Sequence, residues 1–145
     1  MPTRDLADAS PALYQAFVNA KAVFDAVRPG RVVIPICVYR SPEEQWATWM
    51  TARHQLPSGT WAEDDVTGHH RGILTNCDGR MTLSNHNYRP SRAIDFAVQV
   101  DGTIDWNLDA GYAEFGHLCV AQGLVYGGDW IGFKDHDHLE LRKLA

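Results

Sequence analysis

The chain has 145 residues, of which 45% are hydrophobic and 21% are charged, a composition typical of an ordinary globular domain. Its net charge of −5 and pI of about 5.7 argue against a surface built to bind nucleic acid. No apolar run approaches the roughly 20 residues that cross a bilayer, and the first residues lack the apolar stretch of a signal peptide. We therefore expect a single domain over residues 1–145 that does not span a membrane.

The first predicted element is a helix over residues 10–27. Ser10 suits its N-cap and Pro11 its first turn, and apolar residues recur at helical spacing. Residues 31–39 are β-branched and apolar, which predicts a buried strand. Pro35 inside this segment indicates an edge position or a bulge, because proline cannot donate a ladder hydrogen bond.

A second helix is predicted to begin after Ser41, where Ser-Pro-Glu-Glu has the form of a capping box, and to end near His54. Residues 56–81 are interrupted by glycine and proline, so we expect an irregular segment. A segment of this length is often functional. It could line a binding groove or only decorate the surface.

Residues 92–100 alternate as a half-buried strand does, and Asp101-Gly102 predicts a turn. A third helix is expected over residues 108–122 and a short strand over 124–126. A closing strand is expected over 136–141. The three cysteines form an odd set without a Cys-x-x-Cys motif, so we expect free, mostly buried thiols and no disulfide framework. They are Cys37, Cys77 and Cys119.

Two polar clusters could carry chemistry. Asp95 lies within the strand of residues 92–100, where a carboxylate is costly unless it is exposed, paired or bound to a metal. The second cluster is Asp-His-Asp-His-Leu-Glu at residues 135–140, where alternation places His136, His138 and Glu140 on one strand face. Taken alone, Asp95 favours a solvent-facing position on a half-exposed sheet, and the second cluster fits a solvent-exposed strand face about as well as a metal site.

Taken together, the clusters are more informative. Two imidazoles and one carboxylate form a three-ligand set that leaves a position for water, and a further carboxylate nearby could act as a general base. Zinc is favoured, although imidazole also suits nickel, copper and iron. His54, His69 and His70 are rival ligands, whereas His117 lies within a predicted helix and is expected to be a surface or core residue.

Three segments, in this order, resemble motifs of the D-Ala-D-Ala carboxypeptidase/L-alanyl-D-glutamate endopeptidase family of bacterial and phage peptidoglycan peptidases. They are residues 38–45 (VYRSPEEQ), residues 74–96, which include SNHNY and AIDF, and residues 127–139, which begin GGDW. The resemblance implies an α+β fold like that of hedgehog and DD-peptidase domains, with a small, mainly antiparallel sheet flanked by helices.

The resemblance also assigns site residues. It implies one Zn²⁺ per chain, held by His86, Asp95 and His138. Asp135 matches the catalytic carboxylate, and Arg40 matches the arginine that steadies the substrate carbonyl or oxyanion. Three further residues are expected either to contact the substrate or to hold the metal ligands in place. They are Ser84, His136 and Glu140.

The sequence departs from the family pattern between the first two ligands. His86 and Asp95 are nine residues apart, two more than in the motif, and Arg89-Pro90-Ser91 replaces a glycine. We expect the loop to bulge outward, since insertions in surface loops cost little. Asp137 stands where the family has a proline, which leaves His136 as a competing ligand, a supporting donor or a surface residue.

The resemblance implies that the substrate is the peptide stem of peptidoglycan. Aspartate at position 135 resembles the branch that cuts between L-Ala and D-Glu, as phage endolysins do. A D,D-carboxypeptidase or D-Ala-D-Ala dipeptidase and a non-catalytic, zinc-containing wall-binding domain are the alternatives, and a metal-free structural domain is a third. We expect a monomer without a separate wall-binding domain, made in the cytoplasm and released to the wall or periplasm.

Overall fold

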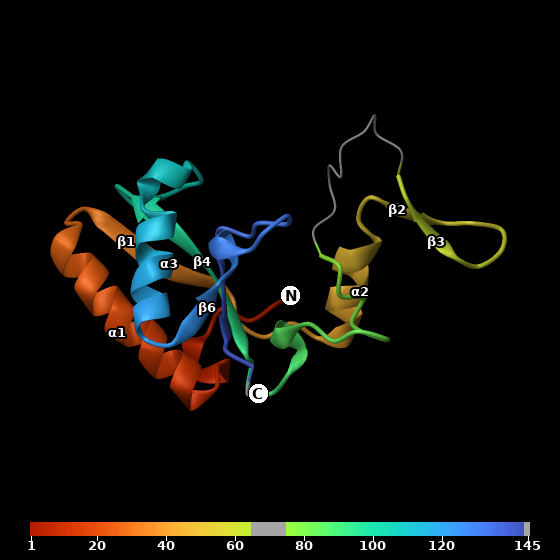
Figure 1. Cartoon of the computed structure of the whole chain (residues 1–145), viewed down its shortest axis with the longest axis horizontal. Coiled ribbons are helices and arrows are strands. Elements are labelled where there is room, and N and C mark those ends of the chain that lie inside the picture. Colours follow the sequence, from red (N-terminus) through yellow and green to blue (C-terminus); the bar gives the residue numbers. More distant parts are fainter. Residues whose placement is uncertain (65–74, 144–145) are drawn as a thin grey trace.

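The computed structural model describes residues 1–64 and 75–143, and shows a mainly antiparallel α+β fold of the predicted class (Figure 1). Across these residues no helix has the length and apolarity to cross a bilayer. The helices are α1 (Pro11–Val27), α2 (Pro42–Met50) and α3 (Tyr112–Ala121), and the strands are β1 (Arg31–Cys37), β2 (Arg53–Gln55), β3 (Trp61–Glu63), β4 (Ala93–Val100), β5 (Thr103–Asp105), β6 (Leu124–Tyr126) and β7 (His138–Leu141).

The main sheet has the strand order β1-β4-β7-β6, with β5 paired to β4 through the predicted turn at Asp101-Gly102. Helices α1 and α3 lie together against this sheet (Figure 1). Phe115 of α3 is the centre of the core. Its ring lies 4.9 Å from that of Phe96 on β4 and 5.3 Å from that of Phe17 on α1, centroid to centroid. These fully buried rings fix the sheet that carries the site.

Strand β1 confirms the edge position or bulge that Pro35 predicts. It is an edge strand, and its register with β4 shifts between Pro35 and Cys37. It ends at Cys37 rather than Tyr39, because the next two residues pair with the N-terminal segment instead. The Val38 amide donates to the Thr3 carbonyl at 2.7 Å, and the Thr3 amide donates to the Tyr39 carbonyl at 2.8 Å.

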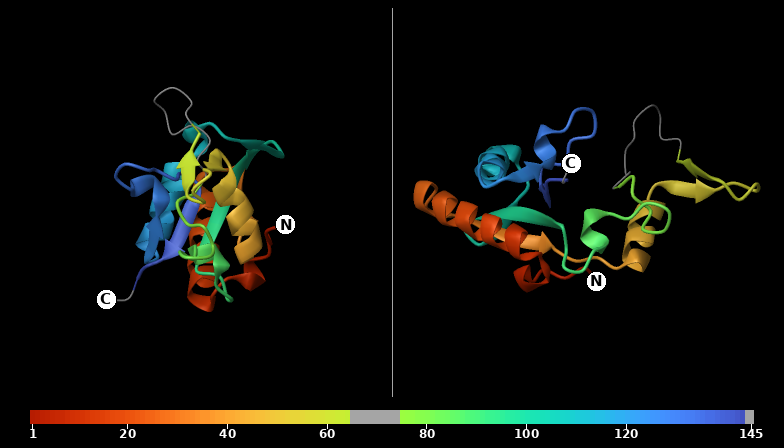
Figure 2. Two further views of the ribbon diagram at one scale, coloured as in Figure 1. Left: turned by 90° about the vertical axis from the view of Figure 1, so that its right-hand side faces the viewer. Right: turned by 60° about the horizontal axis from the view of Figure 1, so that its bottom comes forward.

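The arm, which comprises α2, the hairpin β2–β3 and residues 75–83, stands apart from the helices and sheet (Figures 1 and 2). The prediction that α2 continues to His54 was wrong, as was the prediction of a wholly irregular segment after it. Ala52 adopts a left-handed conformation with φ of 62°, which ends the helical path and turns the chain into the hairpin. Residues 65–74 lie outside the described part of the chain.

Two further boundaries differ from the expected ones. The third helix begins at Tyr112, because Gly111 has a φ of 119° and separates it from a 3-10 turn at Leu108–Ala110. The closing strand begins at His138 rather than His136. The His138 amide donates to the Asp135 carbonyl and closes a turn there, so His136 does not share a strand face with His138.

Candidate metal centre and active site

The candidate site is a row of side chains across three neighbouring strands. In the sheet register, Asp95 on β4 pairs with Cys37 on β1 and with His138 on β7. Asp95 points away from Ile94 and Phe96, which are buried in the core, because successive strand residues face opposite sides. His86 approaches from the 3-10 helix Asn85–Asn87. Four residues that are distant in sequence therefore meet on the sheet face opposite the core.

Three atoms converge at the centre of this row. Asp95 Oδ1 lies 3.2 Å from His86 Nε2 and 3.0 Å from His138 Nδ1. Despite the short distance, His86 Nε2 forms no hydrogen bond within residues 1–64 and 75–143, because the geometry is poor for an N–H pointing at that oxygen. Ligands of a tetrahedral zinc ion lie about 3.3 Å apart. Each of these two nitrogen–oxygen distances suits a metal ion bound at Asp95, but His86 and His138 fall in different groups of possible ligands, and each group includes Asp95.

The second nitrogen of each imidazole explains why the first can act as a ligand. His86 Nδ1 lies 2.9 Å from the Val38 carbonyl, and His138 Nε2 lies 2.9 Å from Glu140 Oε1. A carbonyl and a carboxylate only accept, so these nitrogens carry the protons, and the neutral rings direct lone pairs toward Asp95. Two lone pairs directed at one carboxylate oxygen require positive charge between them, either a metal ion or protons.

The pKa values of His86, His138 and Asp95 agree with a need for positive charge at this point. Burial lowers the pKa of both histidines, but Asp95 outweighs it, so that the pKa of His86 lies well above its usual value and that of His138 is about 9. Burial raises the pKa of Asp95, yet the two histidines hold it well below its usual range. Without a metal, protons supply the positive charge that the three acceptors need. A metal ion binding there would displace these protons.

A pair of carboxylates, Asp135 and Asp137, lies beside this group. Ligand atoms of Asp135, Asp95 and His138 lie within 4.8 Å of one another. The Asp135 amide donates to the Gly127 carbonyl at 3.0 Å, and a Cβ at Gly127 would lie 2.5 Å from the Asp135 carbonyl oxygen. Only glycine fits there. Burial, followed by a hydrogen bond with Asp135, raises the pKa of Asp137 to about 8.

Arg40 lies on the other side of Asp95. Its Nη1 donates to Gln45 Oε1 at 3.0 Å and its Nη2 donates to Cys37 Sγ at 3.4 Å, while Nη2 lies 4.0 Å from Asp95 Oδ2. Gln45 is completely buried and also donates to the Cys77 carbonyl at 2.8 Å. The guanidinium group is therefore held at the junction of the sheet and the arm.

Cys37 and Gln45 are site residues that sequence reasoning did not assign. Cys37 is a buried free thiol, as expected, but its Sγ also lies 3.6 Å from His86 Nδ1. Cys37, His86 and Asp95 form a second group with ligand atoms within 4.8 Å of one another. In the sequence, only the position of Cys37 near the end of a predicted strand could have pointed to its place in the site. For Gln45, only its position in the first family motif could have done so.

The other predicted site residues have different surroundings. Ser84 Oγ accepts from the His86 amide at 3.2 Å, so Ser84 shapes the turn that carries His86. His136 belongs to neither metal-binding group, and its carbonyl accepts from Tyr126 at 2.8 Å. His54 pairs with Asp64 in the arm, and His117 pairs with Asp129. His69 and His70 lie outside the described residues.

The loop between His86 and Asp95 bulges only in part. Arg89 and Pro90 are exposed, but Ser91 is completely buried. Ser91 Oγ bonds the Val38 carbonyl at 2.7 Å, and its amide donates to the Asp8 carbonyl at 2.7 Å. The longer loop is thus tied to the N-terminal segment, and the two ligands keep their register.

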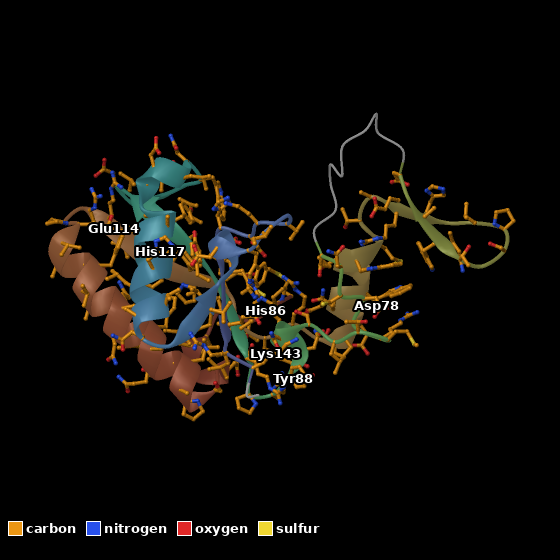
Figure 3. The ribbon with its side chains drawn as sticks, viewed as in Figure 1. Asp78, His86, Tyr88, Glu114, His117 and Lys143 are labelled. Atoms are coloured by element: carbon orange, nitrogen blue, oxygen red, sulfur yellow. The ribbon has the colours of Figure 1, made fainter. Side chains whose placement is uncertain are left out.

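The site opens into a groove of about 1620 Å³ between the sheet and the arm. Arg40, Asp95, Asp135 and His138 all line it. Three residues that line it, His86, Tyr88 and Lys143, are labelled in Figure 3, where they lie on the sheet side, and Asp78 of the arm is labelled next to α2. Fold and site together define an α+β protein with a possible metal-binding group in a groove large enough for a peptide.

Comparisons with known proteins agree with this class. Residues 78–141, slightly less than half of the chain, match the sequence model of the family described as D-alanyl-D-alanine carboxypeptidase. The peptidoglycan L-alanyl-D-glutamate endopeptidase CwlK of Bacillus subtilis (strain 168) is 39% identical over 67 residues, which cover 40% of this chain and 39% of that protein. These matches confirm the family resemblance on the segment that carries the second and third motifs.

The fold has a solved counterpart. The crystal structure of the Serratia marcescens L-Ala D-Glu endopeptidase ChiX superposes with a TM-score of 0.60 over 98% of this chain and 89% of that one. At 16% identity, this likeness establishes the fold alone. It confirms the predicted α+β architecture. The curated relative is matched over about two fifths of its length, so its activity is not transferred by the match itself.

Proposed function

We propose that this chain is a zinc-dependent endopeptidase that hydrolyses the L-alanyl-D-glutamate bond of peptidoglycan peptide stems. The observation that carries the proposal is the convergence of His86 Nε2, His138 Nδ1 and Asp95 Oδ1 in a groove that also contains Asp135 and Arg40. The scissile bond is supported by the printed activities of CwlK and ChiX.

One zinc ion per chain would be held by His86, Asp95 and His138. The donor set fits this metal, because a buried imidazole nitrogen without a hydrogen bond faces a carboxylate and a second imidazole. Bound there, zinc supplies a Lewis acid and makes hydroxide available near neutral pH. Glu140 and the Val38 carbonyl keep the two rings oriented for this task.

The chain's own residues perform the proton transfers and stabilise charge. Asp135 would accept the proton of the attacking water and pass it to the leaving amine. Arg40 would stabilise the negative charge that develops on the carbonyl oxygen. Because Gln45 and Cys37 already hold its guanidinium group, little reorganisation is needed during the reaction.

A second candidate activity remains within the same chemistry. The matching family is described by D-alanyl-D-alanine carboxypeptidase activity, which favours a D,D-carboxypeptidase or D-Ala-D-Ala dipeptidase as the alternative. A wall-binding domain without catalysis is less well supported, because Asp135 and Arg40 both line the groove.

The biological setting that we propose is that of a phage or prophage endolysin, which acts as a monomer on the wall after synthesis in the cytoplasm. This rests on the family resemblance alone. Expression in the cytoplasm should leave bacteria intact, whereas co-expression with a pore-forming protein should lyse them. Lysis without the pore-forming protein, or none with it, would contradict this setting.

Mass spectrometry of peptidoglycan digests tests the activity. Wild-type protein, an EDTA-treated sample and Asp135→Ala are incubated with the same peptidoglycan. We expect new L-Ala and D-Glu ends in the first sample alone. Release of D-Ala alone would assign the carboxypeptidase activity. No cleavage by protein that contains zinc would overturn the proposed function.

A further inference from the structure

The residues that line the groove differ in charge at the two ends of β7. Asp135 and Asp137 precede the strand, and the Trp130 ring lies 5.1 Å from that of His138, its first residue. Arg142 and Lys143 follow the strand, and with Arg92 and Tyr88 they form what we name the basic end. This is unexpected in a chain of net charge −5. A concentration of positive charge along a groove wall indicates an anionic ligand or ligand segment.

Hydrogen bonding brings the basic end together. The Leu141 amide donates to the Arg92 carbonyl at 2.9 Å, so Arg92 lies beside the chain segment that continues into Arg142 and Lys143. The Arg92 guanidinium stacks 3.8 Å from the centre of the Tyr88 ring. Stacking on a ring holds the guanidinium group flat and leaves its edge open to a ligand.

The positive charges of the basic end are available. Within residues 1–64 and 75–143, Arg92, Arg142 and Lys143 have no carboxylate partner, whereas Lys21 and Arg28 on α1 pair with Asp25 and Glu114. Glu140, the nearest carboxylate in sequence, is occupied by His138 at 2.9 Å and by Asn85 at 2.8 Å.

Lys143 and Cys77 line the groove from the sheet side and from the arm. Burial, followed by Asp78 and Glu140, raises the pKa of the Cys77 thiol, whereas Lys143 lowers it. Figure 3 shows Lys143 and Tyr88 near His86, on the side that faces the arm.

We propose that the basic end binds the free carboxylates of the peptide stem on the D-Glu side of the scissile bond. This rests on the proposed function. D-Glu is linked onward through its γ-carboxyl group, so its α-carboxylate is free, and the L-Ala side carries no charge. Only the D-Glu side complements the basic end, and the L-Ala side then extends toward the start of β7, where Trp130 lies. The charges would orient the stem across the metal site.

The test compares two soluble stem peptides that differ only at the D-Glu α-position, one with a carboxylate and one with a carboxamide. Affinities are measured by titration calorimetry with zinc-loaded Asp135→Asn protein, so that binding is read without cleavage. We expect the carboxylate peptide to bind about fivefold more tightly at low salt. The preference should shrink in 0.5 M salt, because exposed charges are screened.

The double change Arg142→Gln with Lys143→Gln should bring the affinity ratio of the two peptides close to one, and Arg92→Gln should lower it in part. The matched control removes two charges from α1 by Lys21→Gln with Arg28→Gln and should keep the ratio. Equal binding of both peptides to the unsubstituted basic end would overturn the inference, as would an equal loss in the control.

The two proposals fail separately. If wild-type protein cleaves both peptides but binds them equally, the carboxylate site is wrong and the peptidase assignment stands. If neither peptide is cleaved while the carboxylate preference depends on the basic end, the binding site stands and the peptidase assignment is wrong.

Discussion

The two walls of the groove are built in different ways. The sheet side rests on fully buried rings, with Phe96, Phe17 and Phe24 packed around Phe115. In the arm, no apolar side chain of residues 42–64 is buried, and three half-buried tryptophans pack against each other instead. They are Trp46, Trp49 and Trp61. The arm is therefore expected to be the less stable wall.

The chemistry follows the same division. His86, Asp95, His138 and Asp135 all belong to the sheet side, where backbone pairing fixes their register. Gln45, at the junction, connects the arm to the site through Arg40. The comparison teaches that the well-packed wall positions the proposed metal ligands, whereas the arm holds Arg40.

The largest effect is expected on the sheet side, for Asp95→Asn. This change removes the anionic oxygen that both metal-binding groups share, so zinc affinity should fall by more than about 100-fold and cleavage with it. Metal analysis after dialysis measures this. The matched control is Asp129→Asn, which alters an exposed carboxylate paired with His117. Retention of zinc by Asp95→Asn would show that the metal is held elsewhere.

The difference in stability between the walls is tested by two truncations. Phe115→Ala should lower the free energy of unfolding by about 3–5 kcal/mol, because it leaves a large cavity in the core. Trp61→Ala should cost clearly less, because that ring is only half buried. Urea denaturation of both variants gives the comparison. Equal losses would mean that the arm and the sheet unfold as one unit.

Glu140→Gln tests the support of a ligand on the sheet side. Glutamine still reaches His138 but accepts its proton more weakly, so zinc affinity should fall by about 10- to 100-fold. Competition with a zinc-binding dye measures the affinity. Glu114→Gln, which changes a carboxylate paired with Arg28 far from the groove, should leave the affinity unchanged. An unchanged affinity in Glu140→Gln would remove Glu140 from the site.

Gln45→Leu tests the contribution of the arm. Leucine fills a similar volume but cannot hold Arg40, so we expect about a tenfold loss in kcat with full zinc content. Thr48→Val, one turn further along α2, is the control, because its hydroxyl bonds only the Glu44 carbonyl within the helix. Loss of zinc in Gln45→Leu would show that the two walls are not independent.

The smallest effect is a pH dependence of the metal-free protein. Burial lowers the pKa of His138, but Asp95 and Glu140 outweigh it and raise it to about 9. An unfolded histidine titrates near 6.5, so the charged ring contributes stability that is full below about pH 6.5 and lost as the pH rises through 9. We expect the free energy of unfolding to fall by on the order of 1–3 kcal/mol over this range.

Urea denaturation of metal-free protein at several pH values measures this dependence. His138→Gln should make it smaller but not abolish it, because the pKa values of His86 and Asp137 are raised as well, whereas His117→Gln, which changes an exposed histidine, should keep it. A fall of the same size in His138→Gln would exclude His138 as its source.

Much of this architecture could be predicted from periodicity and turn chemistry. The strand around Asp95 and the bulge implied by Pro35 were both predicted correctly, although small residues on the Asp95 face, Ala93 and Ala97, are buried as well as the large residues on the other face. The hairpin in the arm was missed, since its short strands are exposed and carry no alternating pattern. The place of Cys37 beside Asp95 could not be predicted either, because it depends on strand register, which no local pattern encodes.

X-ray absorption spectroscopy of the zinc-loaded protein tests the central claim most directly, because the proposed ligands His86, Asp95 and His138 differ in one donor from the group of Cys37, His86 and Asp95. Ligation by His86, Asp95 and His138 predicts nitrogen and oxygen scatterers at about 2.0–2.2 Å, with two imidazoles and no sulfur. A sulfur scatterer at about 2.3 Å that disappears in Cys37→Ser would assign the metal to Cys37, His86 and Asp95 and would contradict the account.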